Sequence, residues 1–307
     1  MTEPSKLPTI VICATGLEHT IYCVWAVRSL RQVGYADIEI FTNSETDRAF
    51  LRRYLGDITV HLLEVDMGGH KAWTYRQFAM LKHTFRPDQK EIVICDTDVL
   101  WKKNPSNLFR RVHGKTWFQK ITAVDPGDFD KDNSEISPDR WGTHTVINYR
   151  KRFGLPAYVN HQVNGGLFLI DTGLYKTVLT KWVAMIRALP PKEVLMTECL
   201  FSVVLGELGV EPGCDRADIK HLTTYRETPV PATVAKFQVI ETPPGSETGY
   251  QVATHYLTGG FKAAFYRDAQ ALGVDPENLA AIARREVLIK KFKRFYSRAR
   301  AALSLSP

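Results

Sequence analysis

The stretch 91-EIVICDTDVLW-101 decides how this chain is expected to fold, because a run of apolar residues ends there in two acids. Ile92 to Cys95 have the pattern of a short strand that is buried on both faces, and Asp96 and Asp98 follow at its end. Alternate residues of an extended chain point to one side, so the two carboxylates can address a single divalent cation. Two carboxylates this close would otherwise repel each other.

The oxygen ligands of this acidic pair favour Mg²⁺ or Mn²⁺, which commonly complete their coordination with substrate phosphates. The alternative is a pair of ordinary turn or helix-capping aspartates, because Asp-x-Asp triplets also occur at 128–130 and 130–132. Those triplets lie in a polar stretch, whereas the pair at 96 and 98 ends an apolar strand. The placement therefore favours the metal-binding hypothesis.

The residues on either side of this strand alternate between strand and helix patterns. Runs of apolar, β-branched residues predict further strands at 9–14, 38–42, 58–64 and 162–171. Apolar residues at helical spacing predict helices at 20–34, 44–56, 73–85, 175–189 and 198–209. Ser44 is the expected N-cap of the second helix. Strands that alternate with helices form right-handed βαβ units, so we predict an α/β fold with a Rossmann-like, mostly parallel sheet that binds ligands at the carboxyl ends of its strands.

One polar segment interrupts the alternation. Residues 125–161 are rich in Pro, Gly, Asp and Asn, which predicts a functional loop region, and we expect an acceptor-side insertion at about 125–162. Gly165 and Gly166 then precede the apolar run at 167–170. Two glycines before a strand allow another group to approach the backbone closely.

The overall composition is that of an ordinary globular protein. The chain has 307 residues, of which 44% are hydrophobic and 24% are charged, enough for a substantial core. Its five cysteines are scattered and odd in number, which indicates reduced packing residues rather than disulfides or a zinc site. The sequence shows no long apolar span and no leader pattern, so we expect a cytoplasmic protein.

The net charge of +7 comes from one segment near the end of the chain. Residues 284–300 contain eight basic residues and one acid, which leaves 32 basic and 32 acidic residues elsewhere. A neutral body argues against a nucleic-acid-binding face, and the basic segment indicates a local anionic partner.

The same segment has the pattern of an amphipathic helix. Leu288, Phe292 and Ala299 fall on one side at helical intervals, with lysines and arginines elsewhere. We expect a tail at 266–307 that binds an anionic membrane surface through residues 284–300, peripherally on the inner face of the cytoplasmic membrane. A helix packed on the domain with a solvated basic face is the alternative.

The chain also contains three motifs, 94-ICDTDVLW-101, 164-NGGLFLIDTG-173 and 255-HYLTGGFKAAF-265. Together they resemble the retaining sugar-nucleotide glycosyltransferases of family 8, which include glycogenin and bacterial lipooligosaccharide galactosyltransferases. The resemblance implies a GT-A fold over about 1–265 that binds a UDP-sugar with a divalent cation, usually Mn²⁺. It makes Asp96, Asp98 and His255 the metal ligands that bridge to the diphosphate.

The resemblance also implies which residues contact the donor. These are Thr15, Gly16, Tyr22, Arg76, Thr97, Gly165, Gly166, Gly259, Gly260 and Lys262. Lys262 departs from the family pattern, because it stands one residue further from the histidine than usual and no Pro-Trp follows it. Ordinary structural roles are the alternatives: a plain loop at 15–16, a solvated helix-face arginine at 76 and a packed histidine at 255.

Asn164 and Glu198 are the catalytic candidates that the resemblance implies. Asn164 would line the donor sugar, and Glu198 falls where the family has an acid or amide near the anomeric carbon. Breaking the bond between sugar and phosphate leaves a UDP dianion, so such an enzyme needs a charge sink more than a strong base. The expected reaction moves a hexose from a UDP-sugar to a hydroxyl group of a glycan or glycolipid, with retention, as in lipopolysaccharide biosynthesis.

Two other functions are compatible with the acidic pair. Four apolar residues followed by Asp-x-Asp are also the first motif of haloacid-dehalogenase-like phosphatases, in which Asp96 would be the nucleophile and Asp98 the acid/base. Nearly a hundred residues of strand and helix units precede the motif, which argues against this reading. A non-catalytic nucleotide-sugar-binding protein is the third possibility.

Overall fold

The structure is a computed structural model that describes residues 7–70, 74–97, 99–101, 104–119, 121–124, 141–155, 161–191, 197–213, 237–240 and 250–253. All of these residues belong to one compact unit of the chain.

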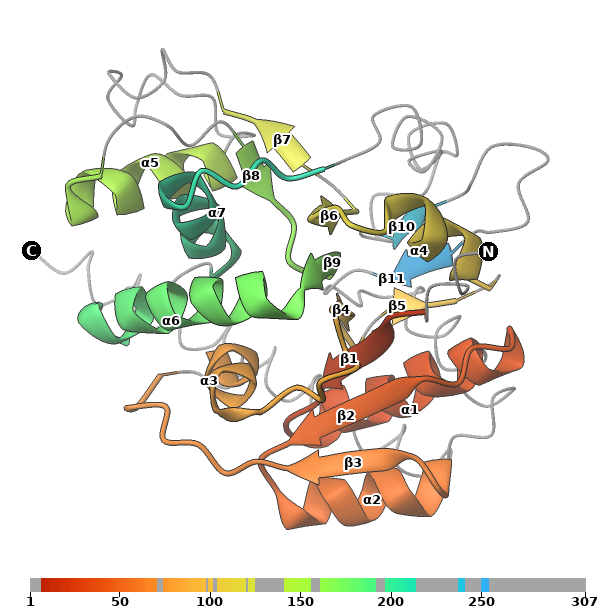
Figure 1. Cartoon of the computed structure of the whole chain (residues 1–307). Coiled ribbons are helices and arrows are strands. Elements are labelled where there is room, and N and C mark those ends of the chain that lie inside the picture. Colours follow the sequence, from red (N-terminus) through yellow and green to blue (C-terminus); the bar gives the residue numbers. More distant parts are fainter. Residues whose placement is uncertain are drawn as a thin grey trace, which may run out of the picture. The chain divides into compact units, whose positions relative to one another are not determined.

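A six-stranded sheet forms the centre of the described fold, with strand order β3-β2-β1-β4-β9-β6 (Figure 1). The parallel part consists of β1 (Thr9–Cys13), β2 (Ile38–Thr42), β3 (Thr59–Leu62) and β4 (Glu91–Cys95). Two strands continue the sheet in antiparallel pairings, β9 (Leu167–Asp171) and β6 (Trp117–Phe118). The predicted α/β fold with a mostly parallel sheet is therefore confirmed.

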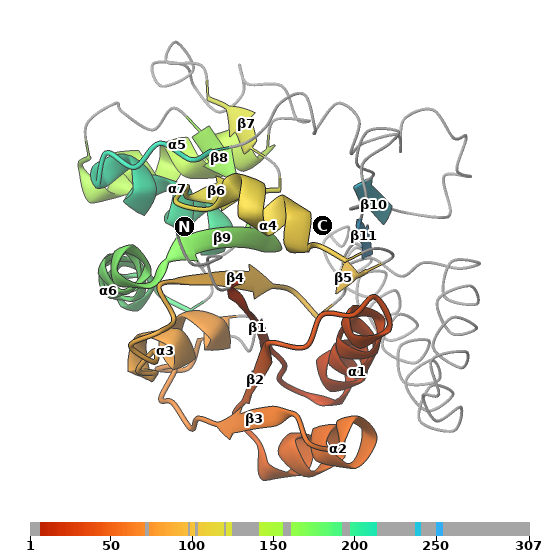
Figure 2. The same cartoon turned by 45° about the vertical axis from the view of Figure 1, so that its right-hand side comes forward.

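Helices cover both faces of this sheet (Figure 2). One face carries α1 (Leu17–Gln32) and α2 (Glu45–Leu55), and the other carries α3 (Tyr75–Lys82) and α6 (Thr172–Ala188). Successive residues of β1 are buried on both sides, which explains why its sequence is almost continuously apolar. The core on the α6 side includes Trp182 and Phe201, whose rings stack with centroids 4.4 Å apart.

Local signals set the ends of two of these helices. The Ser44 Oγ accepts a hydrogen bond from the Asp47 N–H at 3.3 Å, which confirms Ser44 as the N-cap of α2. Helix α2 ends at Gly56, whose φ of 69° is unfavourable for other residues. The Asp171 carboxylate accepts from the Leu174 N–H at 2.8 Å and caps α6 directly at the end of β9.

The stretch predicted to be a polar loop contains a helix, α5 (Trp141–Phe153), so that expectation is wrong for these residues. Val146, Ile147 and Tyr149 are buried, and α5 packs near α7 (Thr197–Glu207). The spacing of a few apolar residues among many polar ones was too sparse to stand out in the sequence. Whether this region contacts an acceptor stays a prediction.

Short strands build two smaller sheets around the main one. One pairs β7 (Ile121–Ala123) with β8 (His161–Val163), and the other has the order β10-β11-β5. In the second, β5 (Val99–Leu100) lies antiparallel to β11 (Tyr250–Ala253), which in turn pairs with β10 (Phe237–Ile240). The remaining described helix is α4 (Ser106–Val112). None of the helices within the described ranges has both the length and the apolar character needed to cross a membrane.

Candidate active site

Three strand ends meet at one edge of the main sheet. Cys95, the last residue of β4, pairs with Ile12 of β1 on one side and with Leu167 of β9 on the other. Because β9 is antiparallel to β4, the residues that precede β9 lie beside those that follow β4. The Asp96 N–H continues the ladder by donating to the Gly166 carbonyl oxygen at 2.7 Å.

Arg76 of α3 reaches this edge and pairs with the first acid. Its Nη1 donates to Asp96 Oδ1 at 2.7 Å and to the Gly165 carbonyl oxygen at 3.0 Å. The two side chains are only 13% and 23% exposed, and the guanidinium carbon lies 5.9 Å from the centre of the Phe168 ring. Arg76 is therefore a largely buried member of the site rather than a solvated arginine on the helix face.

The charges around Arg76 keep it protonated. Burial alone would lower the pKa of its guanidinium, but the Asp96 carboxylate together with Tyr175, Cys13 and Glu198 outweighs this and holds the pKa above its usual value. Glu198 acts in the same direction more weakly. Burial raises the pKa of the Cys13 thiol, at the end of β1, to about 12. Nearby Arg76 lowers this pKa and Asp96 raises it, both less than burial does. Cys13 is thus a neutral thiol at physiological pH and no candidate nucleophile.

The two glycines before β9 are required by close packing of the site's own polar groups. A Cβ atom added at Gly166 would lie 3.0 Å from Asn164 Oδ1 and 3.2 Å from Asp96 Oδ2. One added at Gly165 would lie 3.2 Å from Arg76 Nη2. Larger residues at either position would displace these groups.

Asn164 is held from two sides. Its Oδ1 accepts hydrogen bonds from the Gly166 N–H at 3.0 Å and from Gln119 Nε2 at 2.5 Å. Gln119, which the sequence reasoning missed, directly follows β6, and its N–H donates to the Leu167 carbonyl oxygen at 3.1 Å. The signal that could have found it is the same as for Asp96, a polar residue immediately after a short apolar run.

Glu198 lies in the first turn of α7, next to Gly165. Its Cβ would be 3.6 Å from a Cβ atom added at that glycine. The Ser202 hydroxyl donates to the Glu198 carbonyl oxygen and accepts from the Val163 N–H, both at 3.0 Å. This hydroxyl ties α7 to β8 just before Asn164, so Glu198 and Asn164 are positioned together.

The loop after β1 lies beside the segment that follows β4. His19 Nδ1 and the hydroxyl of the buried Thr97 are 3.1 Å apart, and the Gly16 N–H donates to Asp47 Oδ2 at 2.9 Å. Gly16 has a φ of 80°, which only glycine adopts readily. Tyr22 is 6% exposed and meets the His19 ring edge-on at 6.1 Å. Thr15 belongs to the same loop, and its contact with a nucleotide stays a prediction, as do those of Gly16 and Tyr22.

Five predicted site residues lie outside the described residues, namely Asp98, His255, Gly259, Gly260 and Lys262. The predicted membrane-binding segment at 284–300 also lies outside them. In the part of the chain that is described, no three His, Cys, Asp or Glu side chains gather as metal ligands.

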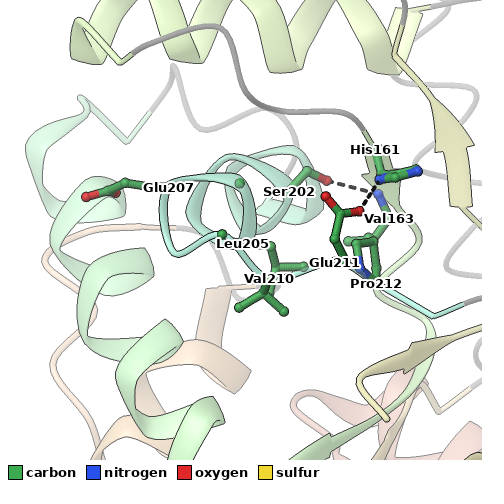
Figure 3. Close-up of a pocket in the computed structure, with 10 residues that line it drawn as sticks. His161, Val163, Ser202, Leu205, Glu207, Val210, Glu211 and Pro212 are labelled. Carbon is green, nitrogen blue, oxygen red and sulfur yellow. Dashed lines mark hydrogen bonds and ion pairs between the residues drawn. The ribbon is translucent and has the colours of Figure 1, made fainter.

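A cavity of about 310 Å³ lies between β8 and the carboxyl end of α7 (Figure 3). Its lining includes His161 and Glu211, whose Nδ1 and Oε2 atoms are 3.4 Å apart. The described members of the predicted site do not line this cavity. We therefore place the candidate active site at the sheet edge, where the buried charges are, rather than in this cavity.

Comparison with solved structures gives a clear likeness in fold. A structure described as the galactosyltransferase LgtC in complex with donor and acceptor sugar analogues matches 89% of this chain and 99% of its own, with 14% identity and a TM-score of 0.50. An active-site mutant of LgtC matches 88% and 98%, with 14% identity and a TM-score of 0.51. The chain has the fold of LgtC. This likeness confirms the predicted GT-A-type fold.

Another structural match is weaker, and the sequence matches no family model. The apo form of mouse xyloside xylosyltransferase 1 matches 68% of this chain and 84% of its own at 14% identity, with a TM-score of 0.38 that is too low to carry an argument. No protein-family model matches the sequence, and no curated protein matches it.

Proposed function

We propose that this chain is a metal-dependent glycosyltransferase that moves a hexose from a UDP-sugar to a hydroxyl group of a glycan or glycolipid acceptor, with retention. One observation carries the proposal: Arg76, Asp96, Asn164 and Glu198 converge at a single edge of the sheet, from four separate parts of the chain. Ligands of open α/β sheets bind at the carboxyl ends of strands, and this is such an edge.

The shared fold supports the reaction class. LgtC is described as a galactosyltransferase bound to analogues of a donor and an acceptor sugar, and nearly all of its chain is matched. This edge offers a guanidinium group, two carboxylates and an amide side by side. Such an edge suits a site for two sugars, because hydroxyl-rich ligands are recognised by a few precisely placed polar groups.

A divalent cation, Mn²⁺ or Mg²⁺, would be held by Asp96, Asp98 and His255. Asp96 fits this role, because its carboxylate is a hard oxygen donor at the end of β4 and side by side with the polar groups of Arg76 and Asn164. The register of the small sheet also supports the set: Val99, which follows Asp98 in the sequence, pairs with Val252, three residues before His255. When bound, the cation would stabilise the negative charge of the departing nucleotide diphosphate.

The residues of the chain would orient the donor around this point. Arg76 supplies a permanent positive charge that is held in place by Asp96 and the Gly165 carbonyl oxygen, so it can face a phosphate or a sugar oxygen without reorganising. Asn164 would contact the donor sugar, and Glu198 would lie near the anomeric carbon. Cys13 is not a candidate nucleophile, because its thiol stays protonated.

The test is a panel of nucleotide sugars incubated with the purified protein and Mn²⁺, or with EDTA, and scored for nucleotide release. We expect release of UDP from one or more UDP-sugars, faster with a glycan acceptor and abolished by EDTA. Free phosphate released from a monoester, with no nucleotide released from any sugar, would instead support the phosphatase. Binding of nucleotide sugars without turnover would support the binding protein.

The fold weighs against the phosphatase. The strand that carries Asp96 is the fourth strand along the chain, and the three strands before it belong to the same sheet. The residues before the acidic pair are thus part of the catalytic domain rather than a separate preceding unit.

Asp98→Ala tests the metal site directly. We expect this variant to lose sugar transfer and metal-dependent UDP binding while its unfolding transition is unchanged, because a carboxylate that serves a cation contributes little to the apo fold. Asp130→Ala, which removes the acid shared by the two triplets of the polar stretch, is a matched control for metal-dependent UDP binding and for donor hydrolysis without an acceptor. Undiminished transfer by Asp98→Ala would refute the assignment.

A further inference from the structure

A buried glutamine behind Asn164 is unfavourable for packing. Gln119 is 4% exposed, and its Oε1 is buried without a hydrogen-bond partner among the described residues. A buried acceptor with no partner loses its hydration and gains nothing in return, a cost that an apolar side chain of similar size would avoid. The hydrogen bond from its Nε2 to Asn164 Oδ1 is therefore what the glutamine provides.

The backbone fixes which atoms of the two amides meet. The Gly166 N–H can only donate, so the atom of Asn164 that lies 3.0 Å from it is the carbonyl oxygen. The Gln119 atom at 2.5 Å from that oxygen must then be a donor, Nε2. Both lone pairs of Asn164 Oδ1 are thus engaged, and the NH₂ group at the other arm of the amide is what Asn164 offers to a ligand.

We propose that Gln119 is a positioning residue that locks the Asn164 amide so that the donor sugar meets an NH₂ group. The proposal rests on the proposed function and deepens it, because it specifies the chemistry of one subsite. The sugar must present an oxygen that accepts a hydrogen bond there, such as a free hydroxyl group. A site built to bond a hydroxyl group discriminates strongly against the analogue that lacks it.

The lock can be tested without any substrate. In Asn164→Asp the new charge lies near Asp96, but the carboxylate still accepts from both the Gly166 N–H and Gln119, so we expect a smaller loss of urea midpoint than in Gln119→Glu. In Gln119→Glu an ionised carboxylate faces Asn164 Oδ1, and two acceptors repel, so we expect a lower midpoint whose difference from the wild type at the same pH shrinks as acid protonates the new side chain. Gln119→Leu should be at least as stable as the wild type, because it removes an unpaired buried acceptor.

The effect on the reaction is measured with UDP-sugars and with UDP alone. We expect Gln119→Leu to lower kcat/KM for nucleotide release from the preferred UDP-sugar by about tenfold or more, since an unlocked amide loses an oriented hydrogen bond. Its affinity for UDP, which lacks the sugar, should not change. A series of monodeoxy donor sugars should reveal one hydroxyl group whose removal harms the wild type far more than Gln119→Leu.

Gln77→Leu is the matched control. Gln77 is also fully buried, and neither its Oε1 nor its Nε2 has a partner within the described ranges. The substitution thus removes the same group from the core, and we expect stability at or above that of the wild type, as for Gln119→Leu, with kcat/KM unchanged.

The outcomes separate the two claims. If the wild type turns over no nucleotide sugar, the proposed function fails, and the urea comparison alone decides whether the lock exists. If the wild type is active but Gln119→Leu keeps its kcat/KM and its hydroxyl discrimination, the positioning role is overturned. Destabilisation by Asn164→Asp, with none by Gln119→Glu, would show that the amide is held the other way round.

Discussion

The ion pair between Arg76 and Asp96 is the residue-scale feature on which the site depends. The sequence places the acid at the end of a strand and the arginine on a helix, but only the fold shows that they touch. Arg76 compensates the charge of Asp96, one of the two acids of the Asp-x-Asp triplet. It therefore has a structural role in the apo protein as well as the proposed role toward the donor.

Removing Arg76 tests the structural role. We expect Arg76→Met to lower the free energy of unfolding by about 2 kcal/mol, less than for a fully buried pair because Asp96 is partly exposed. Asp96→Asn should compensate, so that the double variant costs less than the sum of the two single variants in urea unfolding.

A surface pair is the control for this double-mutant cycle. Arg48 bonds Glu45 at 2.6 Å on α2, but Glu45 is largely exposed, so we expect Arg48→Met to cost about 0.5 kcal/mol or less. Strictly additive effects of the Arg76 and Asp96 substitutions would show that the pair does not couple.

At the scale of elements, long units were predictable and short ones were not. The strands β1, β2 and β4 and the helices α2 and α6 agree with their sequence patterns, because each buries a repeated apolar face. Strands of two residues, such as β5 and β6, are too short to show a period and depend on a distant partner. The sequence also did not predict that β9 runs antiparallel to β4, because a run of apolar residues has the same pattern in a parallel and in an antiparallel strand.

The same limit explains which site residues were found. Asp96 and Asn164 were predicted because each borders a strong strand signal or a resembling motif. Gln119 follows a two-residue strand, and its role depends on the antiparallel pairing of β6 with β9. The contact of His19, in the first turn of α1, with Thr97 likewise depends on the fold and could not be read from the sequence.

A polar cluster between β2, β3 and the end of α3 should make the fold sensitive to acid. Burial lowers the pKa of His83 to about 4, and the neighbouring His61 adds to this, while Glu39 opposes it. Lys176 of α6 and Arg86 also face the cluster and lower the pKa further. The folded protein therefore keeps His83 neutral at a pH where the unfolded chain binds a proton.

The sign of the effect follows from this difference. Stability is complete above about pH 6.5, the usual pKa of histidine, and falls as the pH drops toward about 4. Glu39, whose pKa is lowered despite burial by its contacts with His61 and Arg86, adds a further loss at lower pH. We expect His83→Phe to flatten the fall in urea midpoint between these values, because phenylalanine keeps the aromatic contacts with Phe41 and Phe85. An equal acid slope in both proteins would contradict this assignment.

For the whole molecule, the distribution of charge separates a neutral body from a basic segment at 284–300. The proposed donor does not account for this segment, so we propose a separate anionic partner for it. An anionic membrane surface would bring the protein to a glycolipid acceptor, and each well-placed cation contributes about 1 kcal/mol to such binding.

Truncation after Gly273 tests this proposal. We expect the full chain to sediment with vesicles that contain phosphatidylglycerol, but not with phosphatidylcholine alone, and to be released by salt because the attraction is electrostatic. The truncated protein should stay in solution and still release UDP from its donor. Replacing Lys290, Lys291 and Lys293 with glutamine in the full chain should weaken vesicle binding without changing its length. If the segment instead packs on the domain, truncation will lower the unfolding midpoint. Neither the full chain nor the truncated protein will then bind vesicles.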